Sequence, residues 1–246
     1  MKKEFAVVGI CTGILILCLL TSCQREPMTA QRLIDECAQA MGGIEKIDSL
    51  QTIRLAQNWP DHKNLIYYEI KRPNCVKLGV NAVFDGERAS LLERTRADGT
   101  LREARLVPQE EWKDFERDIA WYVPAFFDYP AEYMGTETLD DIKTHKLRVA
   151  LPLGIVMIYY IDAQTYLVYR VTSHITIDNK ERVSERTYSD YREVDGILYP
   201  HAFTYEGRDG VFTATMVELE FNVPFEDDLF VVPIPEDDDT ISNSGN

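Results

Sequence analysis

Apolar residues recur at helical spacing near the start of the chain. Thr29 stands where its hydroxyl can cap a helix, and Gly42 and Gly43 end the pattern. The apolar positions, three and four residues apart, are Leu33, Ile34, Cys37, Ala38 and Met41. This spacing predicts one amphipathic helix, and residues 44–50 predict a further short helical turn.

From about Ser49 the pattern changes to a period of two, with β-branched and aromatic residues between turn signals. Four Asp-Gly pairs separate apolar runs, and this dipeptide supplies the positive φ angles of tight hairpins. The pairs occupy positions 85–86, 98–99, 195–196 and 209–210. Strands are expected over residues 142–151, 167–177, 183–194, 197–205 and 211–222. The sequence therefore predicts antiparallel strands joined by hairpins.

The clearest alternation lies in residues 167–177. The apolar face comprises Leu167, Tyr169, Val171, Ile175 and Ile177. The polar face comprises Arg170, Thr172, His174 and Thr176. One face of this strand is predicted to meet the core and the other to meet water.

Residues 155–161 are apolar on both faces, which an antiparallel strand tolerates only when both sides are covered. A helix lying across the sheet would supply that cover, either by ordinary packing of a central strand or above an apolar cavity. The pattern leaves both open. If one face lines a cavity, the candidate ligand contacts on this strand are Val156, Ile158 and Tyr160.

A second helix is predicted after Pro108, which suits a first-turn position, with Glu110 and Glu111 near the positive end of the helix dipole. Residues 121–130 follow as a dense aromatic loop with two prolines. This loop either packs into the core or forms a lid over an apolar pocket. The candidate cavity or lid residues of this region are Trp112, Phe115, Ile119, Tyr122, Phe126 and Phe127.

The first residues resemble a bacterial lipoprotein signal. Lys2 and Lys3 precede an uncharged apolar run over residues 5–20, which is shorter than the roughly 20 residues that span a bilayer. Residues 20–23 resemble the lipobox at which such proteins are cleaved and acylated on the cysteine. Cys23 is therefore the expected lipid-attachment site and membrane anchor.

The expected organisation is a signal peptide at 1–22, an acylated tether at 23–28, one domain at 29–235 and a disordered acidic tail at 236–246. Gln24 follows Cys23 where an Asp would retain an enteric lipoprotein in the inner membrane. The expected location is therefore the outer membrane, with the domain facing the periplasm.

Composition narrows the possible partners. The chain has 26 Lys+Arg and 41 Asp+Glu, for a net charge of −15, so nucleic acid repels it. Outside the predicted signal and anchor, Cys37 and Cys75 remain. They are buried free thiols or a single disulfide; the sequence leaves both open.

The chain carries no nucleophile elbow, zinc helix, phosphate loop or dinucleotide fingerprint. His62, His145, His174 and His201 are dispersed, and the Asp run at 237–239 lacks the later ligands of a calcium loop. We assign no catalytic residue, no metal site and no cofactor. A hydrolase with dispersed residues around His145 and His174 is a minor alternative.

Three segments together resemble outer membrane lipoprotein-sorting proteins of the LolA/LolB-like carrier and receptor group. They are residues 41–43, which read Met-Gly-Gly, the strand-turn-strand at 160–167 and the segment at 188–200. The resemblance covers roughly residues 31–233 and rests on the order of elements.

This resemblance implies an α+β, mainly β fold, in which a strongly curved antiparallel sheet forms an incomplete barrel. Helices would cover the open side and enclose an apolar cavity for the acyl chains of lipids or lipoproteins. The acylated Cys23 makes the chain more similar to the anchored receptor than to the soluble carrier. The alternative is an envelope protein–protein interaction or sensor module with a packed barrel and no lipid cargo.

Overall fold

The computed structural model describes residues 27–60, 63–95, 98–177, 179–207 and 210–234. The expectations for the signal peptide, Cys23 and the acidic tail concern residues outside these ranges. Among the described residues, no helix combines the length and apolar character needed to cross a membrane.

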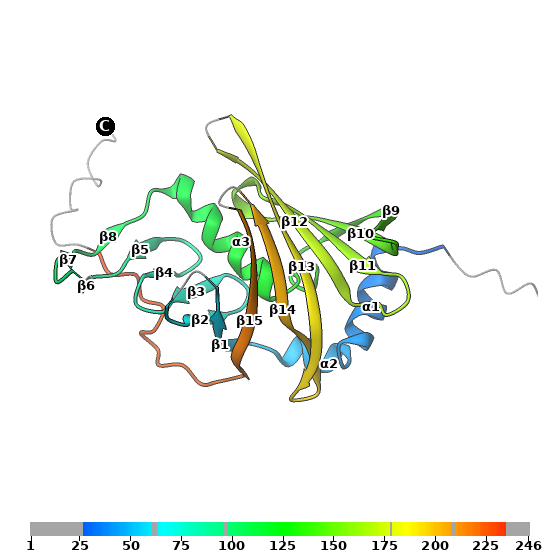
Figure 1. Ribbon diagram of the computed structural model, residues 1–246, viewed down its shortest axis with the longest axis horizontal. Helices are drawn as coiled ribbons and strands as arrows, with labels where there is room; N and C mark the ends of the chain where they lie inside the picture. The colour runs from blue at the N-terminus through cyan, green and yellow to red at the C-terminus, as the bar shows by residue number, and fades with distance from the viewer. Residues whose placement is uncertain (1–26, 61–62, 96–97, 178, 208–209, 235–246) are drawn as a thin grey trace, which may run out of the picture.

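A large antiparallel sheet dominates the described residues (Figure 1). Its thirteen strands follow the order β8-β5-β4-β3-β2-β1-β15-β14-β13-β12-β11-β10-β9. The first part of the chain supplies β1 (Thr52–Asn58), β2 (Ile66–Lys71), β3 (Cys75–Leu78), β4 (Ala82–Phe84), β5 (Ala89–Leu91) and β8 (Arg105–Leu106). The second part supplies β9 (Ala131–Leu139), β10 (Ile142–Ala150), β11 (Val156–Asp162), β12 (Val168–Ile177), β13 (Lys180–Val194), β14 (Ile197–Gly207) and β15 (Gly210–Phe221).

The sheet is not closed into a barrel. The edge strands β8 and β9 do not pair with each other, whereas β1 pairs with β15 in the middle of the sheet. A separate two-stranded ribbon consists of β6 (Arg94–Thr95) and β7 (Leu101–Arg102). The predicted fold, a mainly β half-barrel with few helices, is confirmed.

Three Asp-Gly pairs lie in hairpin connections. They join β4 to β5, β6 to β7 and β13 to β14. Of the fourth pair, Gly210 begins β15 and Asp209 lies outside the described residues. Positive φ angles at Gly86, Gly99 and Gly196 place the glycines where the turns need them.

Two helices precede the sheet and one interrupts it. They are α1 (Ala30–Ala40), α2 (Ile44–Ser49) and α3 (Trp112–Tyr122), with single 3₁₀ turns η1 (Gln109–Glu111), η2 (Ala125–Phe127) and η3 (Pro152–Gly154). The Thr29 hydroxyl accepts a hydrogen bond from the Arg32 N–H, as a cap should. Gly42 has a φ of +120°, and a Cβ there would lie 2.1 Å from the Gly196 carbonyl oxygen. Only glycine lets the end of α1 dock against the β13–β14 turn.

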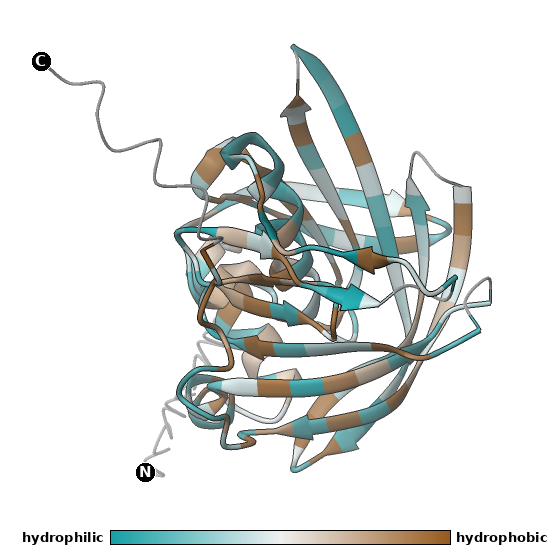
Figure 2. Ribbon diagram, turned by 90° about the vertical axis from the view of Figure 1, so that its left-hand side faces the viewer, coloured by the Kyte–Doolittle hydropathy of each residue, from teal (hydrophilic) through white to brown (hydrophobic). Residues whose placement is uncertain are grey.

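The core lies between the concave face of the sheet and the helices, and hydrophobic and polar positions alternate along the strands (Figure 2). In β12, Val171 and Ile175 are buried as predicted. Tyr169 is not, because Ile161 pairs with Val168 and Tyr160 with Arg170, leaving Tyr169 as an extra residue at a bulge. The bulge reverses the alternation, so the predicted inward placement of Tyr169 is wrong, whereas Leu167 is half-buried and packs against the edge of the core.

Cys37 is buried on the inner face of α1, as its spacing predicts, and Cys75 is half-buried at the start of β3. Both are free thiols. Burial raises the pKa of the Cys37 thiol to about 12, so it behaves as a small apolar side chain.

Candidate functional site

The helix α3 and the aromatic segment that follows it, residues 121–130, cover the concave face of the half-barrel (Figure 1). Near the start of α3, the Phe115 ring stacks on Phe84 of β4 with ring centroids 5.7 Å apart. The Trp112 ring lies 6.2 Å from the same phenylalanine, and its indole N–H donates to the Val107 carbonyl. Ile119 is buried one turn further along. These three predicted site residues face the sheet.

Three tyrosines of the sheet hold the other end of α3. The hydroxyls of Tyr159, Tyr188 and Tyr199 donate to the carbonyls of Ala120, Trp121 and Tyr122 at 2.9, 2.6 and 2.8 Å. Carbonyls in the last turn of a helix have no partner within the helix, so these hydroxyls satisfy groups that would otherwise be buried unpaired. Burial raises the pKa of all three tyrosines, which therefore remain protonated donors.

The aromatic segment packs between this helix end and the surface. The Phe126 ring meets the Tyr159 ring edge to face, with centroids 5.0 Å apart, and Phe127 is half-buried beside it. The same two phenylalanines line an open groove of ≈ 460 Å³ between this segment and the first two helices. The other residues of the groove are Ala30, Gln31, Ile34, Ile44, Tyr129, Pro130 and Ala131.

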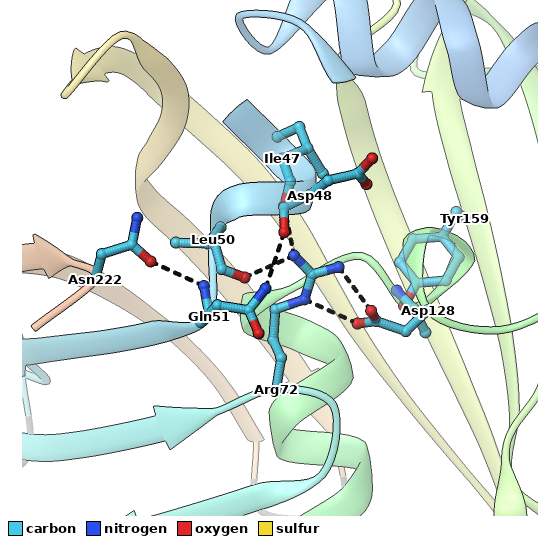
Figure 3. Close-up of polar contacts among 9 residues, drawn as sticks. Ile47, Asp48, Leu50, Gln51, Arg72, Asp128, Tyr159 and Asn222 are labelled. Carbon is cyan, nitrogen blue, oxygen red and sulfur yellow. Dashed lines mark hydrogen bonds and ion pairs between the residues drawn. The ribbon is translucent and has the colours of Figure 1, made fainter. Parts of the chain in front are cut away.

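An arginine holds the aromatic segment against the opposite part of the sheet (Figure 3). The Arg72 guanidinium donates to both carboxylate oxygens of Asp128, at 3.1 and 2.6 Å. Its Nη1 donates to the carbonyls of Ile47 and Leu50 at the end of α2. The pair is largely buried, since the Arg72 side chain is 7% exposed. Arg72 thus joins β2, α2 and the aromatic segment.

The interior beneath α3 also contains buried polar groups. The Tyr122 hydroxyl donates to Oε1 of Gln57 at 3.0 Å, and the Trp59 indole N–H donates to the same oxygen at 3.1 Å. Arg186 of β13 lies close by, with its guanidinium carbon 4.0 Å from the Trp121 ring centroid and 5.0 Å from that of Tyr122. Gln57, Tyr122 and Arg186 are almost wholly buried, and Trp59 is half-buried.

The remaining interior space is small. A cavity of ≈ 20 Å³ lies between the end of α3 and the rings of Tyr159, Tyr188, Tyr191 and Tyr199. A water molecule needs about 10–15 Å³, so this space holds about one. The predicted apolar cavity is therefore present only as a remnant, because α3 and the aromatic rings fill the half-barrel.

Strand β11 shows which of its residues face the site. Its burial alternates strictly, with Met157 and Tyr159 buried against the helix side. The predicted contacts Val156, Ile158 and Tyr160 are half-buried and point to the opposite face. The doubly apolar pattern therefore reflects a covered inner face and a partly apolar outer face. The prediction that Val156, Ile158 and Tyr160 face the cavity is wrong. Their neighbours Met157 and Tyr159 lie on the face covered by the helix.

The described histidines do not gather into a site. The His145 ring pairs with the Tyr133 hydroxyl at 3.0 Å, and His174 with the Glu181 carboxylate at 2.9 Å. Within the described ranges, no group of three or more His, Cys, Asp or Glu side chains has the arrangement of a metal site.

Several residues of the site were not identified from the sequence: Gln57, Arg72, Asp128, Tyr159, Arg186 and Tyr199. The alternation of residues along a strand could have identified Arg186. It lies on the predicted strand 183–194, two positions before Tyr188, and therefore on the same face of that strand. A charged residue on the inward face of a strand marks a polar site inside the half-barrel.

Comparisons with known proteins support the fold. By sequence, the chain matches no protein-family model and no curated protein. By structure, it is similar to a LolA superfamily protein from Nitrosomonas europaea, with a TM-score of 0.52 and 15% identity over 83% of this chain and 98% of that one. A DUF1329 family protein from Desulfovibrio piger gives a TM-score of 0.46 and 14% identity over 82% and 96%. The chain therefore has a LolA-like fold.

Proposed function

We propose that this protein is a non-catalytic envelope lipoprotein that binds the acyl chains of lipids or lipoproteins on the concave face of its half-barrel. The helix α3 and the aromatic segment occupy that face when no chain is bound. Acylated Cys23 anchors the protein in the outer membrane, with the domain in the periplasm.

The proposal rests on which parts of the chain fill the half-barrel. Much of the filling is one helix and one loop from the segment between the two edge strands, packed on side chains of the sheet. Four buried nitrogens beneath this cover have no hydrogen-bond acceptor: Gln57 Nε2, Trp121 Nε1, Arg186 Nε and Arg186 Nη1. Such atoms cost free energy, so the cover is less stable than a fully satisfied core.

The free energy gained by burying an acyl chain is similar to the free energy lost when α3 is displaced. A chain of sixteen carbons leaving water contributes roughly 12 kcal/mol, at about 0.8 kcal/mol for each methylene. Displacing α3 exposes Phe115, Ile119, Trp121 and Tyr122 and breaks three tyrosine hydrogen bonds, which costs roughly 8–16 kcal/mol in total. A bound acyl chain can therefore replace the helix at little net cost.

The groove of ≈ 460 Å³ offers a route of entry, since Phe126 lines it and also packs on Tyr159 at the inner cavity. A hydrocarbon chain in the groove would reach the interior by displacing Phe126. The bonds of Arg72 to Asp128 hold the segment closed in the absence of a ligand.

The test is binding of a fluorescent fatty acyl probe to the full chain carrying Cys23→Ser. The probe should bind, and Phe126→Asp should weaken binding by at least about tenfold, because a carboxylate opposes entry of hydrocarbon. Ile158→Asp, on the outer face of β11, is the matched control and should leave affinity unchanged. If the probe does not bind the full chain that carries only Cys23→Ser, the proposal is contradicted.

A second candidate is an envelope protein-interaction module, favoured by the small size of the inner cavity. Native mass spectrometry of protein extracted from envelopes separates the two. Lipid that co-purifies with the domain supports acyl binding, whereas an empty domain that crosslinks to one envelope protein supports the module.

A further inference from the structure

Arg186 is a buried cation inside the half-barrel. It lies on β13 on the same face as Ser184 and Tyr188 and is 2% exposed. Its guanidinium carbon lies 4.0 Å from the centroid of the Trp121 ring and 4.2 Å from that of Phe203. The charged group is therefore stacked between α3 and β14.

This cation lacks a dedicated counter-ion. Among the described residues, no carboxylate lies within 4.0 Å of its guanidinium nitrogens. The carboxylate whose charge acts on it is that of Asp118, which is paired with Arg117 at 3.1 Å. Burying an unpaired charge costs several kcal/mol, and contacts with aromatic faces return about 2. The Tyr122 hydroxyl and the charge of Asp118 add to the stacking, and Nε and Nη1 of Arg186 still have no hydrogen-bond acceptor among the described residues.

The surrounding polar atoms have an excess of donors. Two guanidinium nitrogens of Arg186, the side-chain amide nitrogen of Gln57 and the indole nitrogen of Trp121 all lack acceptors. The one amide oxygen among these residues, Gln57 Oε1, already accepts two hydrogen bonds. What the cluster lacks is a group that only accepts, such as a carboxylate or a phosphate.

We propose that Arg186 binds the anionic headgroup of the amphiphile whose hydrocarbon chain replaces α3. This inference rests on the proposed acyl binding and adds the ligand class, a lipid with a carboxylate or phosphate group. Trp121 belongs to α3 and covers the guanidinium. The displacement that admits the chain therefore uncovers the guanidinium as well.

Such a site selects by charge. A neutral lipid would displace Trp121 and leave the guanidinium against hydrocarbon with no partner, whereas an anionic group forms two parallel hydrogen bonds with it. Sites with buried hydrogen-bonding groups reject ligands that leave those groups unpaired. The acidic surface of the protein, with a net charge of −15, makes an interior cation the natural place for an anion to bind.

The experiment compares three ligands of equal chain length on the full chain carrying Cys23→Ser: hexadecanoic acid, its methyl ester and palmitoyl lysophosphatidic acid. Affinities are measured by displacement of a fluorescent acyl probe. The acid or the lysophosphatidic acid should bind at least about tenfold more tightly than the ester, and the tighter of the two identifies the headgroup. Arg186→Met should bring both ratios to about one while ester binding remains.

Arg192→Met is the matched control, since Arg192 lies on the same strand but is exposed, and it should preserve the ratios. Arg186→Lys keeps the charge with fewer donors and should give an intermediate ratio; it replaces the Met variant if that variant does not fold. Equal binding of all three ligands by the protein with Arg186 intact, or unchanged ratios in both Arg186 variants, overturns this inference and leaves acyl binding standing. Failure of all three ligands to bind removes the proposed function itself.

Discussion

The helices α1 and α3 have the same length and cover the same sheet, yet they are buried in different ways. The inner face of α1 carries Leu33, Cys37 and Ala38, none of which presents a charge. The inner face of α3 includes the carboxyl group of Glu116, and it meets the sheet through tyrosine hydroxyls and Arg186. Apolar contacts and a backbone hydrogen bond from the Leu198 N–H to the Met41 carbonyl hold α1, whereas α3 depends on polar side chains, several of which are unsatisfied.

The largest expected effect comes from variants that weaken the packing of one helix or the other. Leu33→Ala in α1 and Ile119→Ala in α3 each remove a buried side chain and should lower the free energy of unfolding by about 3 kcal/mol. Loss of contact in α1 should leave acyl-probe affinity unchanged. Loss of contact in α3 should raise it, because the helix competes with the ligand.

Chemical denaturation measures the stability and probe titration the affinity. Equal changes in affinity for the two variants would show that α3 is as permanent a part of the fold as α1.

A smaller effect is expected from the tyrosines that hold the end of α3. Tyr188→Phe and Tyr199→Phe each remove one hydrogen bond while keeping the ring, at a cost of about 1 kcal/mol. Tyr159→Phe removes two, since its hydroxyl donates to the Ala120 carbonyl and accepts from the Ala125 N–H. Each variant should bind the acyl probe about threefold to fivefold more tightly, since less energy is needed to displace the helix.

Tyr191→Phe is the control, because its hydroxyl donates to the Val168 carbonyl on the sheet and not to α3. If Tyr191→Phe raises probe affinity as much as the other three variants, the gain does not come from loosening α3.

The smallest effect concerns pH. Burial raises the pKa of Glu116 to about 7, above the value of an exposed glutamate. The folded protein therefore holds this proton more tightly than the unfolded chain, so stability falls as pH rises from about 4.5 to about 7 and then levels off. Glu116→Gln should remove this dependence and stabilise the protein at pH 8 by on the order of 1 kcal/mol.

Thermal unfolding of both proteins at about pH 5 and pH 8 measures the difference. The two curves should coincide at the lower pH, where the wild-type carboxyl is protonated. A constant offset at both values would mean that Glu116 acts through packing and not through its charge.

The sequence predicts the fold well because its signals are local. The Thr29 cap, the glycine stop at Gly42 and three of the Asp-Gly turns each act within a few residues, and all appear in the structure. The strand β9 and the short strands β2 to β8 were not assigned individually. Strands β2 to β8, of two to six residues each, carry too few alternations to separate them from loops, so their pairing partners define them.

The interior of the site was harder to predict, for two physical reasons. The apolar run in β11 does not reveal which face is inward, and that choice depends on strand register and on the position of α3. Bonds such as Arg72 to Asp128 join residues 56 positions apart, which no local pattern encodes. Trp112, Phe115, Ile119, Tyr122 and Phe126 lie in the covering layer, which helical spacing and aromatic density indicate because both are local signals. That these residues contact a ligand stays a prediction.

The helix α3 belongs to the chain segment that joins β8 to β9, the two outermost strands of the sheet. Because this segment is covalently attached to both edge strands, a displaced α3 would stay close to the sheet and could rebind quickly. Under the proposed acyl binding, displacement of α3 would act on both edge strands at once, because the segment that carries it is joined to each of them. The same covalent continuity that closes the empty protein would signal, at its edges, that the interior is occupied.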